Sequence, residues 1–184
     1  MKRVIYRAFW DYEKEEKWLN TMAEKGWGLV RYTWCRYVFE ESAKGEYIYR
    51  IELLKKRPSH PESKDYLHFL EEAGITCITT YISWVYLRKK ASEGGFNLYS
   101  DAESRMEHYK RVNRIWIIFG FIEGLIGLAN ILLGIMNGQA DYQSRLLNVG
   151  SGLAALVIAV CFAKFSLSLF RKINRLKSER MIRE

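Results

Sequence analysis

Residues 115–136 read IWIIFGFIEGLIGLANILLGIM, and residues 147–170 read LNVGSGLAALVIAVCFAKFSLSLF. At about 1.5 Å of rise per residue, each stretch is long enough as a helix to cross a hydrocarbon core of roughly 30 Å. The first stretch has thirteen Leu, Ile and Phe residues, which favour insertion by roughly −6 kcal/mol, against a cost of about 3 kcal/mol for Glu123. The two stretches therefore predict a pair of transmembrane helices.

Basic residues surround this pair unevenly. Lys110, Arg111 and Arg114 precede the first stretch, and the tail 171–184 is rich in Lys and Arg, whereas the connection 137–146 holds one Arg and one Asp. By the positive-inside rule both termini lie in the cytoplasm and the connection lies outside. The N-terminus has no apolar signal sequence, which also favours a cytoplasmic first domain.

Small and polar residues predict how the two helices pack. Small side chains let membrane helices approach closely. The packing candidates are Gly120, Gly124, Gly127, Asn130, Ala155 and Ala159. In an antiparallel hairpin Lys164 lies about one helical turn from Glu123, so we hypothesise an intramembrane Glu123–Lys164 pair. The alternative is that Glu123 serves as a proton or ion relay.

The first 91 residues alternate between strand-like and helix-like stretches. Residues 18–27, WLNTMAEKGW, match residues 66–75, YLHFLEEAGI, and Ile5-Tyr6-Arg7 matches Ile48-Tyr49-Arg50. These matches predict a duplicated β-α-β-β unit, with repeats over about 3–41 and 46–90. We expect a cytoplasmic α+β domain with one antiparallel sheet and both helices on one face.

The remaining segments connect this domain to the predicted hairpin. Residues 92–99 form a linker, and 100–114 form an amphipathic stalk helix that opens with a capping box, Ser100 to Glu103. The stalk leads into the transmembrane helices 115–136 and 147–170, joined by the external loop 137–146. Residues 171–184 form a basic cytoplasmic tail.

The sequence contains few signs of catalytic chemistry. Its three cysteines and three histidines share no metal-ligand spacing, and no nucleotide-binding or hydrolase motif is present. We expect no enzyme activity, metal or cofactor. The acidic run at Asp11, Glu13, Glu15 and Glu16 is interpreted as the solvated start of a helix. Five tryptophans either pack in a core and on one sheet face or line an aromatic ligand pocket: Trp10, Trp18, Trp27, Trp34 and Trp84.

Four motifs resemble those of a known family. They are FWDYEKEEKWLNTMAEKGWGL at 9–29, GEYIYRIELL at 45–54, SWVYLRK at 83–89 and YSDAESRMEHYKR at 99–111. Together they resemble the bacterial membrane family known as domain of unknown function 2812. The resemblance implies a bacterial cytoplasmic membrane location, gene neighbours resembling PadR transcriptional regulators, and a role in a regulatory or envelope-response system. It implies no catalytic residues.

We therefore expect a membrane-anchored, non-enzymatic sensor or regulatory partner that acts at the cytoplasmic face. The lipid bilayer is one partner, and a membrane protein, a regulatory protein or a second copy of the chain is another. No nucleic acid is expected, because membrane attachment and sheet alternation account for the basic and aromatic residues. The alternatives are an accessory subunit of a transporter, a small-ligand-binding domain with a membrane anchor, an enzyme whose pocket the sequence does not reveal, and a structural envelope protein.

Overall fold

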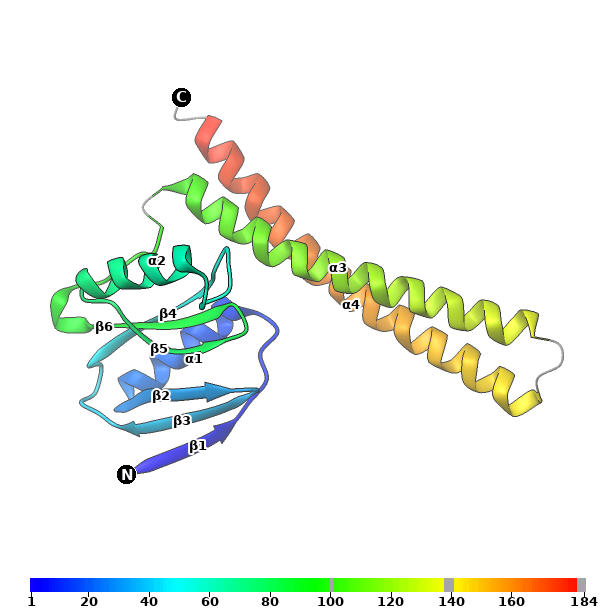
Figure 1. The fold of residues 1–184 in the computed structure, drawn as a ribbon, viewed down its shortest axis with the longest axis horizontal. Coiled ribbons are helices and arrows are strands. Elements are labelled where there is room, and N and C mark those ends of the chain that lie inside the picture. The colour runs from blue at the N-terminus through cyan, green and yellow to red at the C-terminus, as the bar shows by residue number, and fades with distance from the viewer. Residues whose placement is uncertain (100, 138–140, 182–184) are drawn as a thin grey trace. The chain divides into compact units, whose positions relative to one another are not determined.

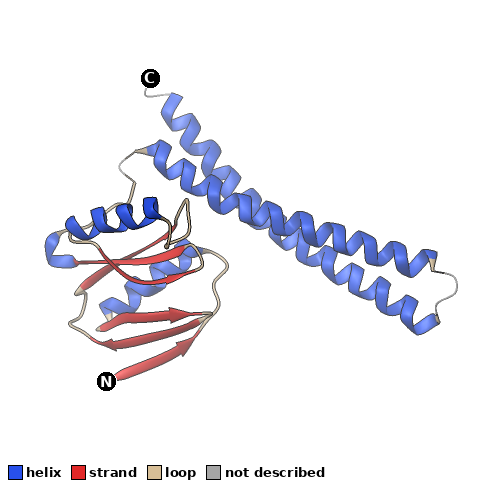
Figure 2. Ribbon diagram, viewed as in Figure 1, coloured by secondary structure: helices blue, strands red, loops and turns tan. Residues whose placement is uncertain are grey.

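The protein is described by a computed structural model that covers residues 1–99, 101–137 and 141–181, without the side chains of 180 and 181. The chain divides into two compact units, Met1–Ser100 and Asp101–Glu184. Figure 2 shows that the described strands all belong to the first unit, whereas the second unit is helical.

The first unit contains two three-stranded antiparallel sheets. Sheet A has the order β1-β3-β2, and sheet B has the order β4-β6-β5. The elements of this unit are β1 (Lys2–Tyr6), α1 (Tyr12–Glu24), β2 (Trp27–Thr33), β3 (Arg36–Glu41), β4 (Tyr47–Leu53), α2 (Pro61–Glu72), β5 (Thr76–Tyr81), β6 (Trp84–Lys90) and the short 3-10 helix η1 (Ala91–Glu93). The prediction of an antiparallel α+β domain is confirmed, but its strands form two sheets and not one.

The two halves of this unit follow the same strand order, β-α-β-β, with the third strand in the middle of each sheet. The register also shifts at matching places, after Leu29 in β2 and after Cys77 in β5. The descent of both halves from one duplicated unit stays a prediction. Strand pairing aligns the halves differently from the proposed residue match. The offset that matches 18–27 with 66–75 also matches Tyr37 of β3 with Val85 of β6. Tyr37 pairs with Ile5, whereas Val85 pairs with Glu52 and not with Ile48.

The two helices cover opposite faces of sheet B, so the prediction of both helices on one face is wrong. Tyr86 packs in a core cluster with α1 and sheet A. Its neighbours Val85 and Leu87 pack in a second cluster with Leu70 of α2. Successive side chains of a strand point to opposite faces, so sheet B is apolar on both sides and needs two covering layers. The layers run sheet A, α1, sheet B, α2 (Figure 1).

Local sequence explains how α1 begins and which face it buries. The Asp11 side chain accepts a hydrogen bond from the Glu13 amide at 3.0 Å, which satisfies one free N–H of the first turn. Leu19, Met22 and Ala23 recur at helical spacing and are buried. The helix ends before Gly26, whose φ of 83° lies in the left-handed region that glycine adopts most easily.

The second unit is a hairpin of two long helices, α3 (Ala102–Met136) and α4 (Tyr142–Met181). The predicted stalk and first span are one continuous helix, and α4 starts within the predicted loop 137–146 and extends into the predicted tail. The cap of α3 is Asp101, which accepts a hydrogen bond from the Ser104 amide at 2.7 Å. Ser100, the predicted cap, lies outside the described residues. The two helices run side by side and antiparallel (Figure 1).

Both helices are long and apolar enough to cross a membrane. In the most apolar 18-residue segment of each helix, only 6% of the residues of α3 and 11% of those of α4 are buried. In the core helix of a soluble protein, most residues of such a segment would be buried against the rest of the protein. The exposed apolar surface therefore agrees with the membrane-spanning prediction made from the sequence.

Candidate functional site

Glu15 on α1 is a carboxylic acid side chain that is only 7% exposed. The hydroxyl groups of Tyr37 and Tyr86 both donate to its Oε1 atom, each at 2.7 Å. Tyr37 belongs to β3 of sheet A, and Tyr86 belongs to β6 of sheet B. One carboxyl oxygen on the intervening helix therefore connects the two sheets.

The environment of Glu15 changes its acidity. Burial raises the pKa of the Glu15 carboxyl above its ordinary value, and the hydrogen bonds from Tyr86 and Tyr37 oppose that rise. Burial also raises the pKa of both tyrosines, and the nearby Glu15 carboxylate adds to the rise. Both tyrosines consequently keep their protons and act as donors. Tyr32 completes the aromatic surroundings, with its ring centroid 4.7 Å from those of Tyr37 and Tyr86.

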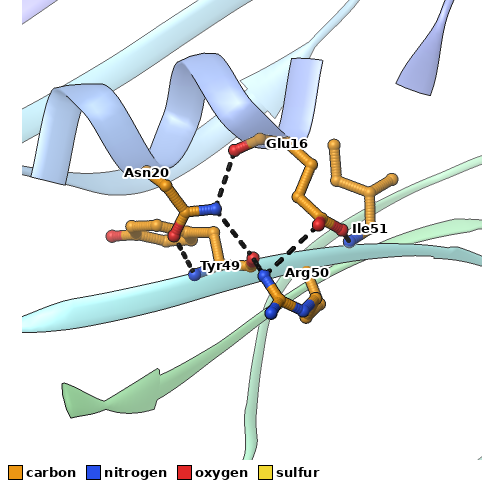
Figure 3. Close-up of polar contacts among 5 residues, drawn as sticks. All are labelled: Glu16, Asn20, Tyr49, Arg50 and Ile51. Atoms are coloured by element: carbon orange, nitrogen blue, oxygen red, sulfur yellow. Dashed lines mark hydrogen bonds and ion pairs between the residues drawn. The ribbon is translucent and has the colours of Figure 1, made fainter. Parts of the chain in front are cut away.

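A second set of polar side chains on α1 covers the free edge of β4 (Figure 3). The Asn20 amide accepts from the Tyr49 N–H at 2.8 Å and donates to the Tyr49 carbonyl at 3.1 Å. Glu16 accepts from the Ile51 N–H at 3.0 Å and from the Arg50 guanidinium at 3.3 Å. Because Glu16 and Asn20 are four residues apart, they lie on the same face of the helix. Their side chains replace the neighbouring strand that an edge strand lacks.

Two further hydrogen bonds join sheet A to sheet B. The Tyr49 hydroxyl oxygen accepts from the Leu29 N–H at 2.7 Å, close to the irregularity in β2. The Thr79 hydroxyl donates to the Tyr32 carbonyl at 3.4 Å.

We refer to Glu15, Glu16 and Asn20 with their partners as the α1 polar network. Its hydrogen bonds hold α1 between the two sheets, and its polar groups serve as hydrogen-bond partners for one another.

The acidic run at the start of α1 was interpreted as solvated, which is wrong for Glu15. Glu15 precedes Leu19 by four residues, so it lies on the buried stripe of the helix. That spacing is a signal that sequence reasoning could have used. The tyrosine partners could not have been identified in the same way, because they come from distant strands of two different sheets.

The order of elements and the membrane-length helices can now be compared with known proteins. The family described as "Protein of unknown function (DUF2812)" matches residues 11–121. The chain belongs to the DUF2812 family. The match covers α1, both sheets except β1, and the first part of α3. No match is found to a curated protein or to a solved structure.

The five tryptophans of this DUF2812 member do not gather at one place. Trp18, Trp27 and Trp84 are partly buried and pack against the core cluster around α1. Trp10 and Trp34 are 62% and 73% exposed. The first three therefore help to fill the core, as one of the two interpretations expects.

Of the predicted packing glycines, Gly127 lies against the opposite helix of the hairpin, whereas Gly124 does not. A Cβ atom on Gly127 would lie 2.9 Å from the Gly152 carbonyl oxygen, and one on Gly152 would lie 2.7 Å from the Gly127 carbonyl oxygen. Gly152, which sequence reasoning missed, is thus the backbone partner of Gly127 across the two helices. By contrast, a Cβ on Gly124 would meet nothing within 4 Å.

The other predicted hairpin residues lie around this contact. Gly120 faces Phe162 and Ala159, and Ala155 is buried. The Asn130 side chain donates to the Ile126 carbonyl of its own helix at 2.9 Å.

The proposed intramembrane pair, Glu123 and Lys164, is not joined in the structure. Glu123 is half-buried and Lys164 is exposed. No ion pair connects them in the described part of the chain. The pairing therefore rests on the sequence alone.

The cysteines and histidines are also dispersed. Cys35 and Cys77 are half-buried free thiols and Cys161 is exposed. His60 caps α2 through its Nδ1 atom, which accepts from the Glu62 amide at 3.3 Å. Among the described residues, no three His, Cys, Asp or Glu side chains form a group that could hold a metal ion.

Proposed function

We propose that this chain is a non-enzymatic, membrane-anchored sensor or regulatory protein whose first unit works at the cytoplasmic face. In this proposal α3 and α4 cross the bacterial cytoplasmic membrane, both termini are cytoplasmic, and the binding partner is a regulatory or membrane protein. Its genetic setting is the one that the family resemblance implies, beside a PadR-like regulator.

One observation carries the proposal: α3 is a single unbroken helix from Ala102 to Met136, so its polar first turns and its apolar stretch form one continuous element. Its pairing with α4 also extends beyond both apolar stretches, because Lys172 Nζ lies 5.6 Å from the centroid of the Tyr109 ring. Trp116 packs on Phe162 and Phe165 about two turns further in, with ring centroids at 5.6 and 5.3 Å. A helix pair packed in this way moves as a unit, so it suits the transmission of a change between cytoplasm and membrane.

The hydrogen bonds of the connecting turn support the proposed orientation. Arg145 is the one basic residue in the sequence of segment 137–146. Its Nε atom donates a hydrogen bond to the Gly134 carbonyl at 3.1 Å. That bond satisfies a free carbonyl at the end of α3, where the helix dipole favours a positive charge. Arg145 thus has a local structural role, whereas Arg171, Arg175 and Lys177 at the opposite end are exposed. The asymmetry follows the positive-inside rule.

An accessory role in a transporter is the second candidate. Gly124 lies outside the contact between α3 and α4, and Glu123 beside it is half-buried. A small residue next to a polar one in a membrane helix is a suitable contact for a further helix. The third candidate, a small-ligand-binding domain with an anchor, has no comparable support in the structure.

Native mass spectrometry of the tagged full chain, extracted from its own membranes in mild detergent, distinguishes the first two candidates. For the regulatory function we expect a partner that is released by Val30→Asp or Phe69→Asp, two exposed positions of the first unit. Gly124→Leu should leave that complex intact, because the position is open in the hairpin. A polytopic partner that Gly124→Leu releases, and that both first-unit variants retain, would contradict the proposal and establish the accessory role.

A further inference from the structure

The two hairpin turns of the first unit carry large apolar residues in an unusual backbone conformation. Trp34 follows β2 and has a φ of 38°, and Ile82 follows β5 and has a φ of 58°. Each side chain is 73% exposed. Left-handed backbone is costly for bulky and especially β-branched residues, and two-residue turns favour Asn and Gly there. Folding of the unit does not account for Trp34 and Ile82, because their apolar side chains gain little burial.

The two turns lie side by side at one end of the unit. The ring of Trp34 has its centroid 6.2 Å from that of Tyr81, the last residue of β5. The strand β1 ends here as well, because Tyr6 pairs with Arg36 just after the first turn, and Tyr6 is also 73% exposed. We call Tyr6, Trp34 and Ile82 the tip patch.

Basic residues border the tip patch. The Leu54 N–H donates to the Ser83 carbonyl of the second turn at 2.9 Å, so the end of β4 is fixed beside Ile82. The next three residues are Lys55, Lys56 and Arg57, and all three are exposed. Asp11, five residues after Tyr6 in the chain, uses its carboxylate to cap α1, and Glu52, which precedes this basic segment in β4, is only 5% exposed. The border of the patch is therefore more basic than acidic.

We propose that the tip patch inserts into the headgroup region of an anionic bilayer, with Lys55, Lys56 and Arg57 against the lipid phosphates. Tryptophan and tyrosine favour the boundary between water and hydrocarbon, and neighbouring Lys and Arg residues attract anionic headgroups. The inference rests on the membrane anchoring proposed above. A bilayer held by the same chain is present at high effective concentration, so even a small patch can engage it.

Photocrosslinking in the full chain tests this contact. Separate variants place p-benzoylphenylalanine at Trp34, at Ile82 and, as a matched control, at Phe69, which is 64% exposed on α2. Each variant is irradiated in nanodiscs that contain phosphatidylglycerol or phosphatidylcholine alone, and the adducts are identified by mass spectrometry. We expect lipid adducts at 34 and 82, severalfold above those at 69, and only with phosphatidylglycerol. Replacing Lys56 and Arg57 with Gln should lower the yield by at least about fivefold, given roughly 1 kcal/mol per basic residue.

Each other outcome has a defined meaning. Adducts between two copies of the chain at 34 or 82 would overturn the proposal in favour of a homodimer contact. Yields at 34 and 82 no higher than at 69 would overturn it as well. Slow hydrogen exchange of the Phe39 and Leu87 amides confirms that each variant is folded. If one of the two tip variants fails to fold, the other still tests the contact. If the chain fails to enter nanodiscs at all, the proposed membrane anchoring fails; if it enters without tip adducts, only the present inference fails.

Discussion

The hydrogen bonds of Glu15 make a quantitative prediction. Replacing Tyr37 and Tyr86 by Phe removes the two hydroxyl groups that donate to Glu15 Oε1 at 2.7 Å. A hydrogen bond to a charged group contributes about 1.5–3 kcal/mol, so the double replacement should lower the free energy of unfolding by about 3–6 kcal/mol. The loss is large because the carboxylate stays buried after its donors have gone.

The same double replacement should behave differently when Glu15→Leu is already present. In that background the two tyrosine hydroxyls have lost their acceptor, and removing them should be neutral or stabilising. The difference between the two backgrounds is the coupling energy of the network. Hydrogen exchange of the most protected amides in β3 and β6 of the full chain measures each free energy. An equal cost of the Phe replacements in both backgrounds would refute the network as a source of stability.

Three further predictions concern other contacts. Gly127→Ala or Gly152→Ala should destabilise the helical hairpin by about 1–3 kcal/mol in a detergent unfolding assay, because the new methyl meets backbone; Gly124→Ala, with open space, should not destabilise it. Asn20→Ala should lower stability by about 1–3 kcal/mol and speed exchange of the β4 edge amides, since both side-chain hydrogen bonds to Tyr49 are lost; unchanged exchange would show that other groups protect the edge. Burial raises the folded pKa of Glu15, so the free energy of unfolding should fall as the pH rises from the group's ordinary pKa of 4.5 through the folded pKa. Glu15→Gln should remove that fall, and identical pH profiles of the two proteins would contradict the assignment.

Local sequence patterns predicted the elements of this protein well. The predicted bounds of about 3–41 and 46–90 agree to within about one residue with the outer ends of β1 and β3 and of β4 and β6. The layering could not be predicted in the same way. Both faces of β6 are apolar, and the sequence does not say which helix covers which face. That choice depends on contacts between residues more than sixty positions apart, such as Glu15 and Tyr86.

The candidate site shows the same division between local and distant information. The burial of Glu15 follows from helical spacing, but the sharing of one carboxyl oxygen by two tyrosines depends on how two sheets meet. Similarly, Gly127 was identified as a packing residue, whereas its partner Gly152 depends on the exact crossing of the helices. Trp34 was grouped with the other tryptophans by residue type alone, and its exposure in the turn between β2 and β3 depends on the fold.

The proposed orientation, in which α3 and α4 span the membrane with both termini in the cytoplasm, can be measured directly. The direct test uses a full chain with its three native cysteines replaced by Ser and one new cysteine, at Lys44, Gln143 or Lys177. Intact spheroplasts are treated with a membrane-impermeant maleimide before and after permeabilisation. We predict labelling of the Gln143 site from outside, and labelling of the Lys44 and Lys177 sites only after permeabilisation. Labelling at Lys44 or Lys177 in intact cells, or protection of Gln143 until permeabilisation, would contradict the account.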